Sequence, residues 1–320
     1  METKGFSKNI DLLKSLGAPV AVVGSINADL TVETERLPEP GETVVGGPLA
    51  ILPGGKSANQ AVTCALLGAD VNLIGAVGLD GHGDLLLASL QKAGVNTLGI
   101  RRVEQPSGST LITVDKAGEN TIVYSAGANN AVDAKMVHSK RRLIREANVL
   151  GLCLEAPIEA VQEAARIAHK AGKTVVLNYS PIVKVPDSLL EQVDVLIVNE
   201  HELAVLSGRK LDAESSEDLE KAMRELDCDR VVLTLGANGS KVLEDGEIFD
   251  VPAVRVETVD TTGAGDSFMG TLLCTLSAGH SLVDGAKLAA VVSALATKKI
   301  GAQASYRNAD EVEEFLKTQA

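Results

Sequence analysis

Residues 260–279 read DTTGAGDSFMGTLLCTLSAG, a turn of small residues that leads into a long apolar segment. Residues 266–278 are apolar or small nearly all the way round, so we predict a buried helix rather than an amphipathic one. Gly263, Ala264 and Gly265 precede it and leave backbone N–H groups accessible at the positive end of the helix dipole. A helix start of this kind can bind a phosphate group.

Asp266 follows these small residues directly, and its carboxylate has two interpretations. Aspartate is a favoured N-cap residue, so it could serve only to begin the helix. A carboxylate would, however, repel a phosphate bound at the same place unless it took part in the chemistry. Phosphoryl transfer to an alcohol needs a group that accepts the hydroxyl proton and donors that stabilise the phosphate charge. We therefore interpret residues 260–268 as a catalytic unit for phosphoryl transfer.

The composition argues against several classes of protein. The 320 residues, 45% of them hydrophobic, are enough for one large α/β domain or two smaller ones. The net charge of −13 opposes nucleic-acid binding, and a chain with 0 Trp, 4 Phe and 3 Tyr is poorly suited to base stacking. No apolar run reaches membrane-spanning length and the N-terminus has no signal-peptide core, so we expect no membrane partner. The 4 scattered cysteines are expected to be reduced thiols of a cytoplasmic protein.

Short runs rich in β-branched residues alternate with longer helix-like segments along most of the chain. The runs resemble fully buried strands and span residues 19–26, 71–78, 147–153, 173–178, 193–199 and 229–236. Most of the clearest helical segments end at Gly, as helix C-termini do. They span residues 57–68, 83–94, 157–172 and 217–227. This alternation predicts an α/β fold with a doubly wound, mostly parallel sheet and helices on both faces.

Two stretches depart from this alternation. Residues 28–53 and 108–125 show strand-like alternation with turn residues and no helical pattern, and the second predicts a hairpin that turns at DKAGEN. Strands that are polar on one face indicate a small sheet projecting from the main body, a β-lid. No repeat or linker divides the chain, so we predict a single domain over residues 1–320, with residues 1–18 as an N-terminal extension of one or two helical turns.

A second glycine-rich motif, PGGKSANQA, spans residues 53–61. Gly54 and Gly55 allow a ligand to approach the backbone closely. Lys56 adds a positive charge, and Asn59 offers both a donor and an acceptor in the first turn of a predicted helix. A glycine pair before a helix is weak support by itself, but its combination with residues 260–268 is much stronger.

These two motifs, together with NEHE (199–202) and TLGANG (234–239), resemble the ribokinase-like family of sugar and nucleoside kinases, also called the phosphofructokinase-B family. Their order and spacing extend the resemblance from about residue 20 to residue 306. Further segments are similar to members of the family that phosphorylate ribose: GSINADL (24–30), SAGAN (125–129), LCLEAP (152–157) and KIGAQAS (299–305). The resemblance implies the ribokinase-like fold and an ATP-dependent kinase that converts D-ribose to ribose 5-phosphate.

The resemblance also implies roles for individual residues. Asp266 would be the general base for the primary hydroxyl of the sugar, and Gly263, Ala264 and Gly265 would form an anion hole. The sugar site would comprise Asn27, Ala28, Asp29, Gly55, Lys56, Ser57, Ala58, Asn59, Glu155 and Asp266. The nucleotide site would comprise Asn199, Thr234, Leu235, Gly236, Ala237, Asn238, Gly239, Gly265 and Ala290.

The same resemblance implies two bound ions and supports a dimeric assembly. Asn199 and Glu202 would help to hold Mg²⁺ with the ATP phosphates, through water. A monovalent cation, K⁺, would activate the enzyme close to the anion hole. Its matching positions, several of them acting through backbone carbonyls, are Asp260, Thr262, Ala296, Lys299, Gly301 and Ser305. The exposed strand faces of the β-lid, together with the resemblance, predict a homodimer formed through the lid.

The acceptor and the class of protein leave alternatives open. A dense set of polar side chains suits a polyol, because each buried polar group left unsatisfied costs about 1–3 kcal/mol. Deoxyribose, a nucleoside or a sugar phosphate would keep Asp266 and change the pocket, and a sugar sensor would not need the base. The spacing G-x-G-x-x-G of a Rossmann dehydrogenase is missing.

Two segments depart from the family motifs. Ser57 stands where the family usually has a smaller residue and would add a hydroxyl near the sugar, and NYSP (178–181) replaces the more familiar Asn-Pro-Ala-Pro.

Overall fold

The computed structural model describes residues 2–319, which fold around a nine-stranded sheet with the strand order β13-β12-β11-β10-β9-β8-β1-β4-β5. The strands β11, β10, β9, β8, β1, β4 and β5 run parallel to one another. Strands β12 and β13 are antiparallel additions at one edge. The strands are β1 (Pro19–Val23), β4 (Asp70–Gly78), β5 (Asn96–Val103), β8 (Val149–Leu152), β9 (Thr174–Asn178), β10 (Val195–Asn199), β11 (Val231–Thr234), β12 (Ser240–Glu244) and β13 (Glu247–Val251). The predicted mostly parallel α/β sheet is confirmed.

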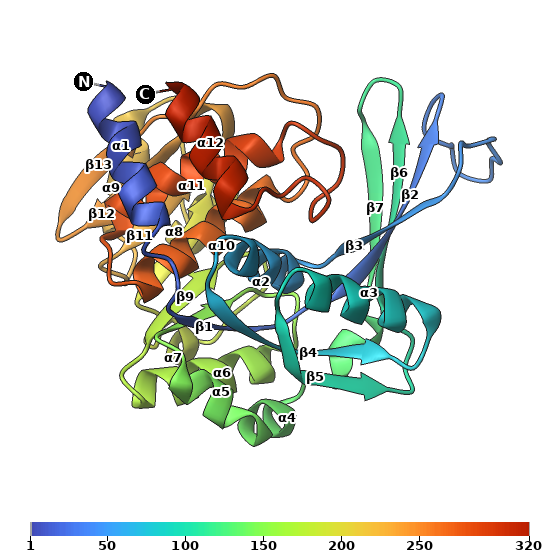
Figure 1. Ribbon diagram of the computed structural model, residues 1–320. Helices are drawn as coiled ribbons and strands as arrows, with labels where there is room; N and C mark the ends of the chain where they lie inside the picture. Colours follow the sequence, from blue (N-terminus) through green and yellow to red (C-terminus); the bar gives the residue numbers. More distant parts are fainter. Residues whose placement is uncertain (1, 320) are drawn as a thin grey trace.

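Helices pack on both faces of this sheet (Figure 1). Successive residues of β1 alternate between the two cores, with Val20 and Val22 in one and Ala21 and Val23 in the other. The first core is covered by α1 (Glu2–Leu13), α2 (Lys56–Leu66), α3 (Gly81–Lys92), α10 (Ala264–Ser277), α11 (Leu282–Ala296) and α12 (Ala309–Gln319). The second is covered by α4 (Ala134–Ser139), α5 (Arg141–Glu146), α6 (Ile158–Lys170), α7 (Asp187–Leu190), α8 (Glu200–Ser207) and α9 (Ser216–Arg224).

A second, smaller sheet projects from this body (Figure 1). Its order is β3-β2-β6-β7, built from β3 (Ala50–Gly54), β2 (Asn27–Thr34), β6 (Gly108–Asp115) and β7 (Asn120–Ser125). The β6–β7 hairpin turns where the sequence predicts it, and β2 pairs in parallel with β6. The sheet is formed by the two stretches expected to make a lid, while its action as a lid stays a prediction.

The sheet order creates a switch point between β1 and β8. From β1 the chain proceeds outward to β4 and β5, and from β8, on the other side of β1, it proceeds to β9, β10 and β11. The loops that follow β1 and β8 therefore diverge and leave a crevice at the carboxyl ends of the parallel strands, where α/β sheets bind ligands. Asn27, Glu155 and Asn199 all lie at this edge.

The N-terminal extension is longer than the one or two helical turns expected. Helix α1 has 12 residues and lies beside α12, near the C-terminus (Figure 1). Leu12, Leu13 and Leu16 are buried, and Lys14 Nζ lies 3.1 Å from an oxygen of Glu313 on α12. Tertiary packing of an apolar face stabilises helical turns that the local sequence alone does not.

None of the helices within residues 2–319 combines the length and the apolar character needed to cross a membrane.

Candidate active site

Asp266 lies in the first turn of α10, but its carboxylate does not cap the helix. The N-cap position is held by Gly263, whose φ of 76° is in the left-handed region, and no described side chain caps this helix start. The carboxylate instead accepts a hydrogen bond from Asn59 Nδ2 on α2, with 2.8 Å between Nδ2 and Oδ2. The N-cap interpretation of Asp266 is therefore wrong, and the side chain is held for another purpose.

The start of α10 presents backbone donors to a cleft. Ala264 N–H donates within the turn, to Thr261 O at 3.2 Å. Gly263 and Gly265 line the cleft, whereas Ala264 does not. Of the three residues expected to form an anion hole, Gly263 and Gly265 therefore reach the cleft, while the Ala264 N–H is used within the turn. The anion hole itself stays a prediction.

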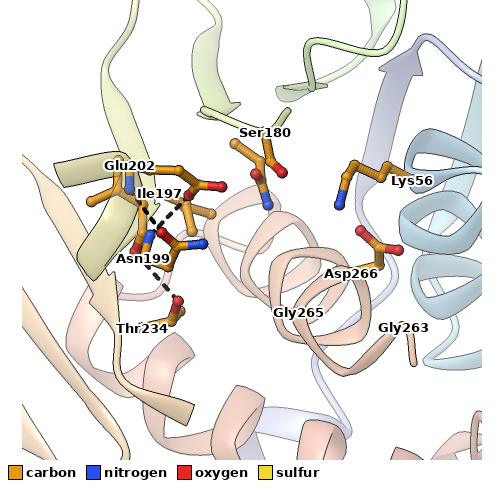
Figure 2. Close-up of a pocket in the computed structure, with 11 residues that line it drawn as sticks. Lys56, Ser180, Ile197, Asn199, Glu202, Thr234, Gly263, Gly265 and Asp266 are labelled. Atoms are coloured by element: carbon orange, nitrogen blue, oxygen red, sulfur yellow. Dashed lines mark hydrogen bonds between the residues drawn. The ribbon is translucent and has the colours of Figure 1, made fainter. Parts of the chain in front are cut away.

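Lys56 lies beside Asp266 on the same side of this cleft, opposite Asn199 and Glu202 (Figure 2). Its backbone N–H donates to Glu155 Oε2 at 3.1 Å, and Ser25 Oγ donates to the same oxygen at 2.5 Å. The Asp266 carboxylate raises the pKa of Lys56, although burial opposes this. Burial in turn raises the pKa of Asp266, against the opposing effects of Lys56 and Asn59. A buried base beside a fixed positive charge is an arrangement suited to proton transfer and anion binding.

The cleft has a volume of about 160 Å³ and runs from Asp266 to the carboxyl ends of β9, β10 and β11 (Figure 2). Its far wall is lined by Asn178, Ser180, Ile197, Val198, Asn199, Glu202 and Thr234. Asn199, Glu202 and Thr234 were predicted, whereas Asn178 and Ser180 were assigned no role. Ser180 is one of the residues of NYSP that depart from Asn-Pro-Ala-Pro, whereas Asn178 matches that motif. Asn178 also ends β9 at the ligand-binding edge of the sheet, and this position could have indicated a role.

Asn199 and Glu202 form a capping box at the start of α8. Glu202 N–H donates to Asn199 Oδ1 and Asn199 N–H donates to Glu202 Oε2, each at 2.8 Å. Burial raises the pKa of Glu202, and the backbone bond from Asn199 opposes this. The capping box uses Asn199 Oδ1, the single oxygen of that side chain, and one of the two carboxylate oxygens of Glu202. The described chain contains no cluster of three or more His, Cys, Asp or Glu side chains that could hold a metal directly.

The side chains expected around the sugar gather on the other side of Asp266. Asp29, on β2, is surrounded by Thr110, Glu155 and Asp266. Burial raises the pKa of Asp29 to about 6, the hydrogen bond from Thr110 lowers it, and the neighbouring carboxylates Glu155 and Asp266 raise it further. Asn27 is buried and its Oδ1 accepts from Asn129 Nδ2 at 2.7 Å. Asn27, Asp29 and Glu155 do not line the cleft that contains Lys56 and Asp266, and their roles in sugar binding stay predictions.

Ser57 and Ala28 are placed differently from the other residues of the expected sugar site. The Ser57 side chain is fully buried, and its Oγ contacts Cys153 Sγ at 3.1 Å and Val23 O at 3.4 Å. The expectation that this residue adds a hydroxyl near the sugar is therefore corrected: helix α2 turns the side chain into the core, toward Gly24. Ala28 is also fully buried, because it alternates with Asp29 along β2.

The segments expected to hold a monovalent cation are tied together by Asp260. Its Oδ2 accepts from Gly301 N–H at 2.8 Å, and its Oδ1 accepts from Thr262 N–H at 2.9 Å. Although burial opposes it, these bonds lower the pKa of Asp260. Tyr306 OH donates to Gly263 O at 2.9 Å, which joins the C-terminal segment to the start of α10. The K⁺ site itself stays a prediction.

The rest of the expected nucleotide site follows β11. Residues 235–239 include the short helix η2 (Gly236–Asn238), which Leu235 separates from the end of β11, while Ala290 is buried on α11. Among these residues, Thr234 lines the cleft beside Asp266 and the others do not. The nucleotide roles of residues 235–239 and Ala290 stay predictions.

The fold and site define a class of enzyme, the kinases that phosphorylate small alcohols at the carboxyl edge of a doubly wound sheet. Residues 18–309 match the pfkB family of carbohydrate kinases, and the chain belongs to this family. This match confirms the family that the glycine-rich motifs predicted.

Several relatives that the chain resembles are ribokinases. A ribokinase of Schizosaccharomyces pombe is 37% identical over 92% of this chain and 96% of its own length, and one of Haemophilus influenzae is 35% identical over 93% and 98%. The structure is similar to that of Arabidopsis thaliana ribokinase complexed with ribose and ATP, with a TM-score of 0.87 and 32% identity over 94% of this chain and 99% of that one. The expected ribokinase-like fold is confirmed.

Proposed function

We propose that the protein phosphorylates D-ribose at its 5-hydroxyl group, with ATP as the phosphoryl donor. The ribokinases to which it is similar, one of them solved with ribose and ATP, support this substrate pair. The observation that carries the proposal is the buried Asp266 carboxylate, oriented by Asn59 and placed beside the open start of α10. A sugar sensor would have no use for a base at that position.

In this mechanism the sugar hydroxyls bind between acceptors on Asp29 and Glu155 and donors on Lys56 and Asn59. The 5-hydroxyl lies against Asp266, which accepts its proton as the oxygen attacks the γ-phosphorus in line. The transfer is direct, with no phosphoenzyme, and the proton passes to the carboxylate while ADP leaves.

The charge that develops on the moving phosphoryl group is stabilised by the backbone N–H groups of Gly263 and Gly265 and by Lys56. Preorganised donors of this kind need no rearrangement during the reaction, which is why they lower the barrier effectively. A Cβ added at Gly265 would meet no described atom within 4 Å, so the glycine leaves open space where a phosphate can approach.

Two ions complete the proposal. Bound Mg²⁺ would neutralise the charge of the ATP phosphates. Asn199 and Glu202 fit contact through water, because the capping box holds them at the cleft and leaves Glu202 Oε1 and the Asn199 amide nitrogen for water molecules. K⁺ would be held by the loops that Asp260 joins, with carbonyl groups at the matching positions from residue 260 to residue 305.

We also propose that the protein acts in the cytoplasm as a homodimer joined through the β-lid. Apolar side chains on one face of the lid support an interface: Leu111 and Val123, which pair across β6 and β7, are 51% and 61% exposed. Val123→Glu should give a monomer in analytical ultracentrifugation, whereas the surface variant Val205→Glu on α8 should not. A wild-type protein that sediments as a monomer would contradict this part of the proposal.

The direct test of the function is an ATP-coupled assay across pentoses, hexoses and nucleosides, with product identified by NMR. We expect D-ribose to give the highest kcat/KM and the phosphate to appear on the 5-oxygen. Deoxyribose should be slower, since an acceptor on Asp29 or Glu155 would be left unpaired. A preference for a nucleoside, or ATP hydrolysis without sugar phosphorylation, would overturn the proposal.

A further inference from the structure

A chain of hydrogen-bonded side chains leads from Asp266 to the surface of α3. Asn59 Nδ2 donates to Asp266 Oδ2 at 2.8 Å, and Asn59 Oδ1 accepts from Gln303 Nε2 at 3.1 Å. Gln303 Oε1 in turn accepts from Ser89 Oγ at 3.3 Å. The mechanism proposed above uses neither Gln303 nor Ser89.

The direction of these hydrogen bonds is fixed by the carboxylate at one end. An ionised carboxylate can only accept, so Asn59 must turn its NH₂ group toward Asp266. Its Oδ1 then points the other way and requires a donor, which Gln303 provides through Nε2. Each bond polarises the next one, so the donor from Gln303 also strengthens the bond from Asn59 to Asp266.

The position of Gln303 makes this arrangement specific. It lies two residues after Gly301, whose N–H is bound by Asp260, and two residues before Ser305, whose Oγ donates to Ala302 O at 2.7 Å. The segment is thereby anchored on both sides. Gln303 itself is half-buried, so its side chain can be exchanged without disturbing either hydrophobic core.

We propose that Gln303 is a positioning residue for phosphoryl transfer, which acts on Asp266 through Asn59. By donating to Asn59 it holds that amide in the one orientation that keeps the Asp266 carboxylate ionised and pointed at the sugar. This inference rests on the proposed function, because it assigns Gln303 to the general base of that reaction.

Several charged or titratable groups face Asp266 and must be considered with it. Lys56 on α2 favours the ionised carboxylate, whereas Glu155, after β8, disfavours it. Asp29 on β2 and Tyr306 in the C-terminal segment also lie close enough to interact with its charge. Since burial and the other carboxylates oppose ionisation, Lys56 and the bond from Asn59 are the main features that maintain it.

The test compares Gln303→Met, which removes the donor at nearly constant volume, with Gln91→Met, the same change on the surface of α3. For Gln303→Met we expect kcat to fall about five- to tenfold, the loss of roughly one hydrogen bond. The KM for ATP should stay within about twofold, because the nucleotide side of the cleft is untouched. The acidic limb of the kcat–pH profile should move up by about half a pH unit, as the ionised base is less well stabilised. Gln91→Met should change none of these.

Two further measurements separate positioning from simple structural support. Gln303→Glu places an acceptor opposite Asn59 Oδ1, so its kcat should be lower than that of Gln303→Met at high pH, where both carboxyl groups are ionised. In a double-mutant cycle, Gln303→Met should have little further effect once Asn59→Ala is present, because Gln303 acts through that residue. Additive effects, or an unchanged pH profile in both Gln303 variants, would overturn the inference.

The proposed function and this inference can fail separately. If the wild-type protein phosphorylates an alcohol other than ribose, the substrate assignment fails and the variants are measured with that acceptor. If no acceptor is phosphorylated, the titration of the Asp266 carboxyl carbon by ¹³C NMR gives the same comparison without turnover. An upward displacement of that titration in Gln303→Met supports the positioning role, and an identical titration refutes it.

Discussion

Asn59 Nδ2 and Asp266 Oδ2 lie 2.8 Å apart, although 207 positions separate the two residues in the chain. The bond joins the two glycine-rich motifs, one at the start of α2 and the other at the start of α10. Lys56 at the start of α2 and Gly263, Gly265 and Asp266 at the start of α10 line one cleft, so this contact holds together the segments that are proposed to supply the base and the anion hole.

The role of Asp266 as the base can be tested with Asp266→Asn. The amide keeps an oxygen that can accept from Asn59, but it cannot take a proton, so kcat should fall by about 10²–10⁴-fold. Ribose binding, measured by calorimetry, should stay within a few-fold of wild type. A folded variant that keeps most of its turnover would exclude Asp266 as the base.

The anion hole can be tested with a matched pair of glycine substitutions. Gly265→Ala should fold normally, since the added Cβ meets no described atom within 4 Å, but should lower kcat by crowding the phosphate. Gly263→Ala should unfold at lower temperature, because its φ is 76° and the Cβ would lie 2.5 Å from Tyr306 Oη. Thermal unfolding and kcat measured side by side would show the contrast, and full activity in Gly265→Ala would argue against the anion hole.

Sugar binding should weaken in acid because of Asp29. Burial raises its pKa to about 6, so the carboxylate that accepts from hydroxyl groups is formed above that pH and is lost as the pH falls through it. The KM for ribose should therefore rise below pH 6, with the KM for ATP less affected. Asp29→Asn should have a high KM that no longer varies over this range. An equal pH response in the variant would assign the titration to another group.

Ser57 should have little influence on the choice of sugar. Its hydroxyl contacts Cys153 and Val23 in the core, so Ser57→Ala should reduce the free energy of unfolding by about 1 kcal/mol through the lost hydrogen bond. The KM for ribose should change by less than about twofold, since the hydroxyl does not face the sugar. A large change in KM without loss of stability would contradict this placement.

The monovalent cation site can be tested through Asp260. Replacing K⁺ by Na⁺ should slow the wild-type enzyme, because the carbonyl groups would not match the smaller ion as well. Asp260→Ala removes the acceptor of the Gly301 N–H and should abolish the difference between the two ions. Indifference of the wild-type rate to K⁺ would eliminate the site. Thr258→Ala, in the same segment, serves as a control.

The local pattern of residues was sufficient for most of the fold. Runs of β-branched residues marked six parallel strands, and apolar periodicity marked the helices between them, because both depend on contacts close in sequence. The antiparallel pair β12–β13 was missed, although Asp245 and Gly246, both with positive φ, form the two-residue turn that such a hairpin favours. Strand β5 was missed as well, since its half-buried pattern includes Arg101 and Arg102.

The sequence by itself determined the family, the small-residue turn at the start of α10 and the acid that follows it, because these depend on neighbouring residues and on motif spacing. Only the tertiary structure decided what those groups contact: that Asp266 is bound by Asn59 instead of capping its helix, that Ser57 faces the core, and that Asn178 and Ser180 join the cleft. The order of strands in the sheet brings distant segments to one edge. Packing sets the direction of each side chain at this edge. It depends on contacts between residues far apart in the chain, which a local sequence pattern does not contain.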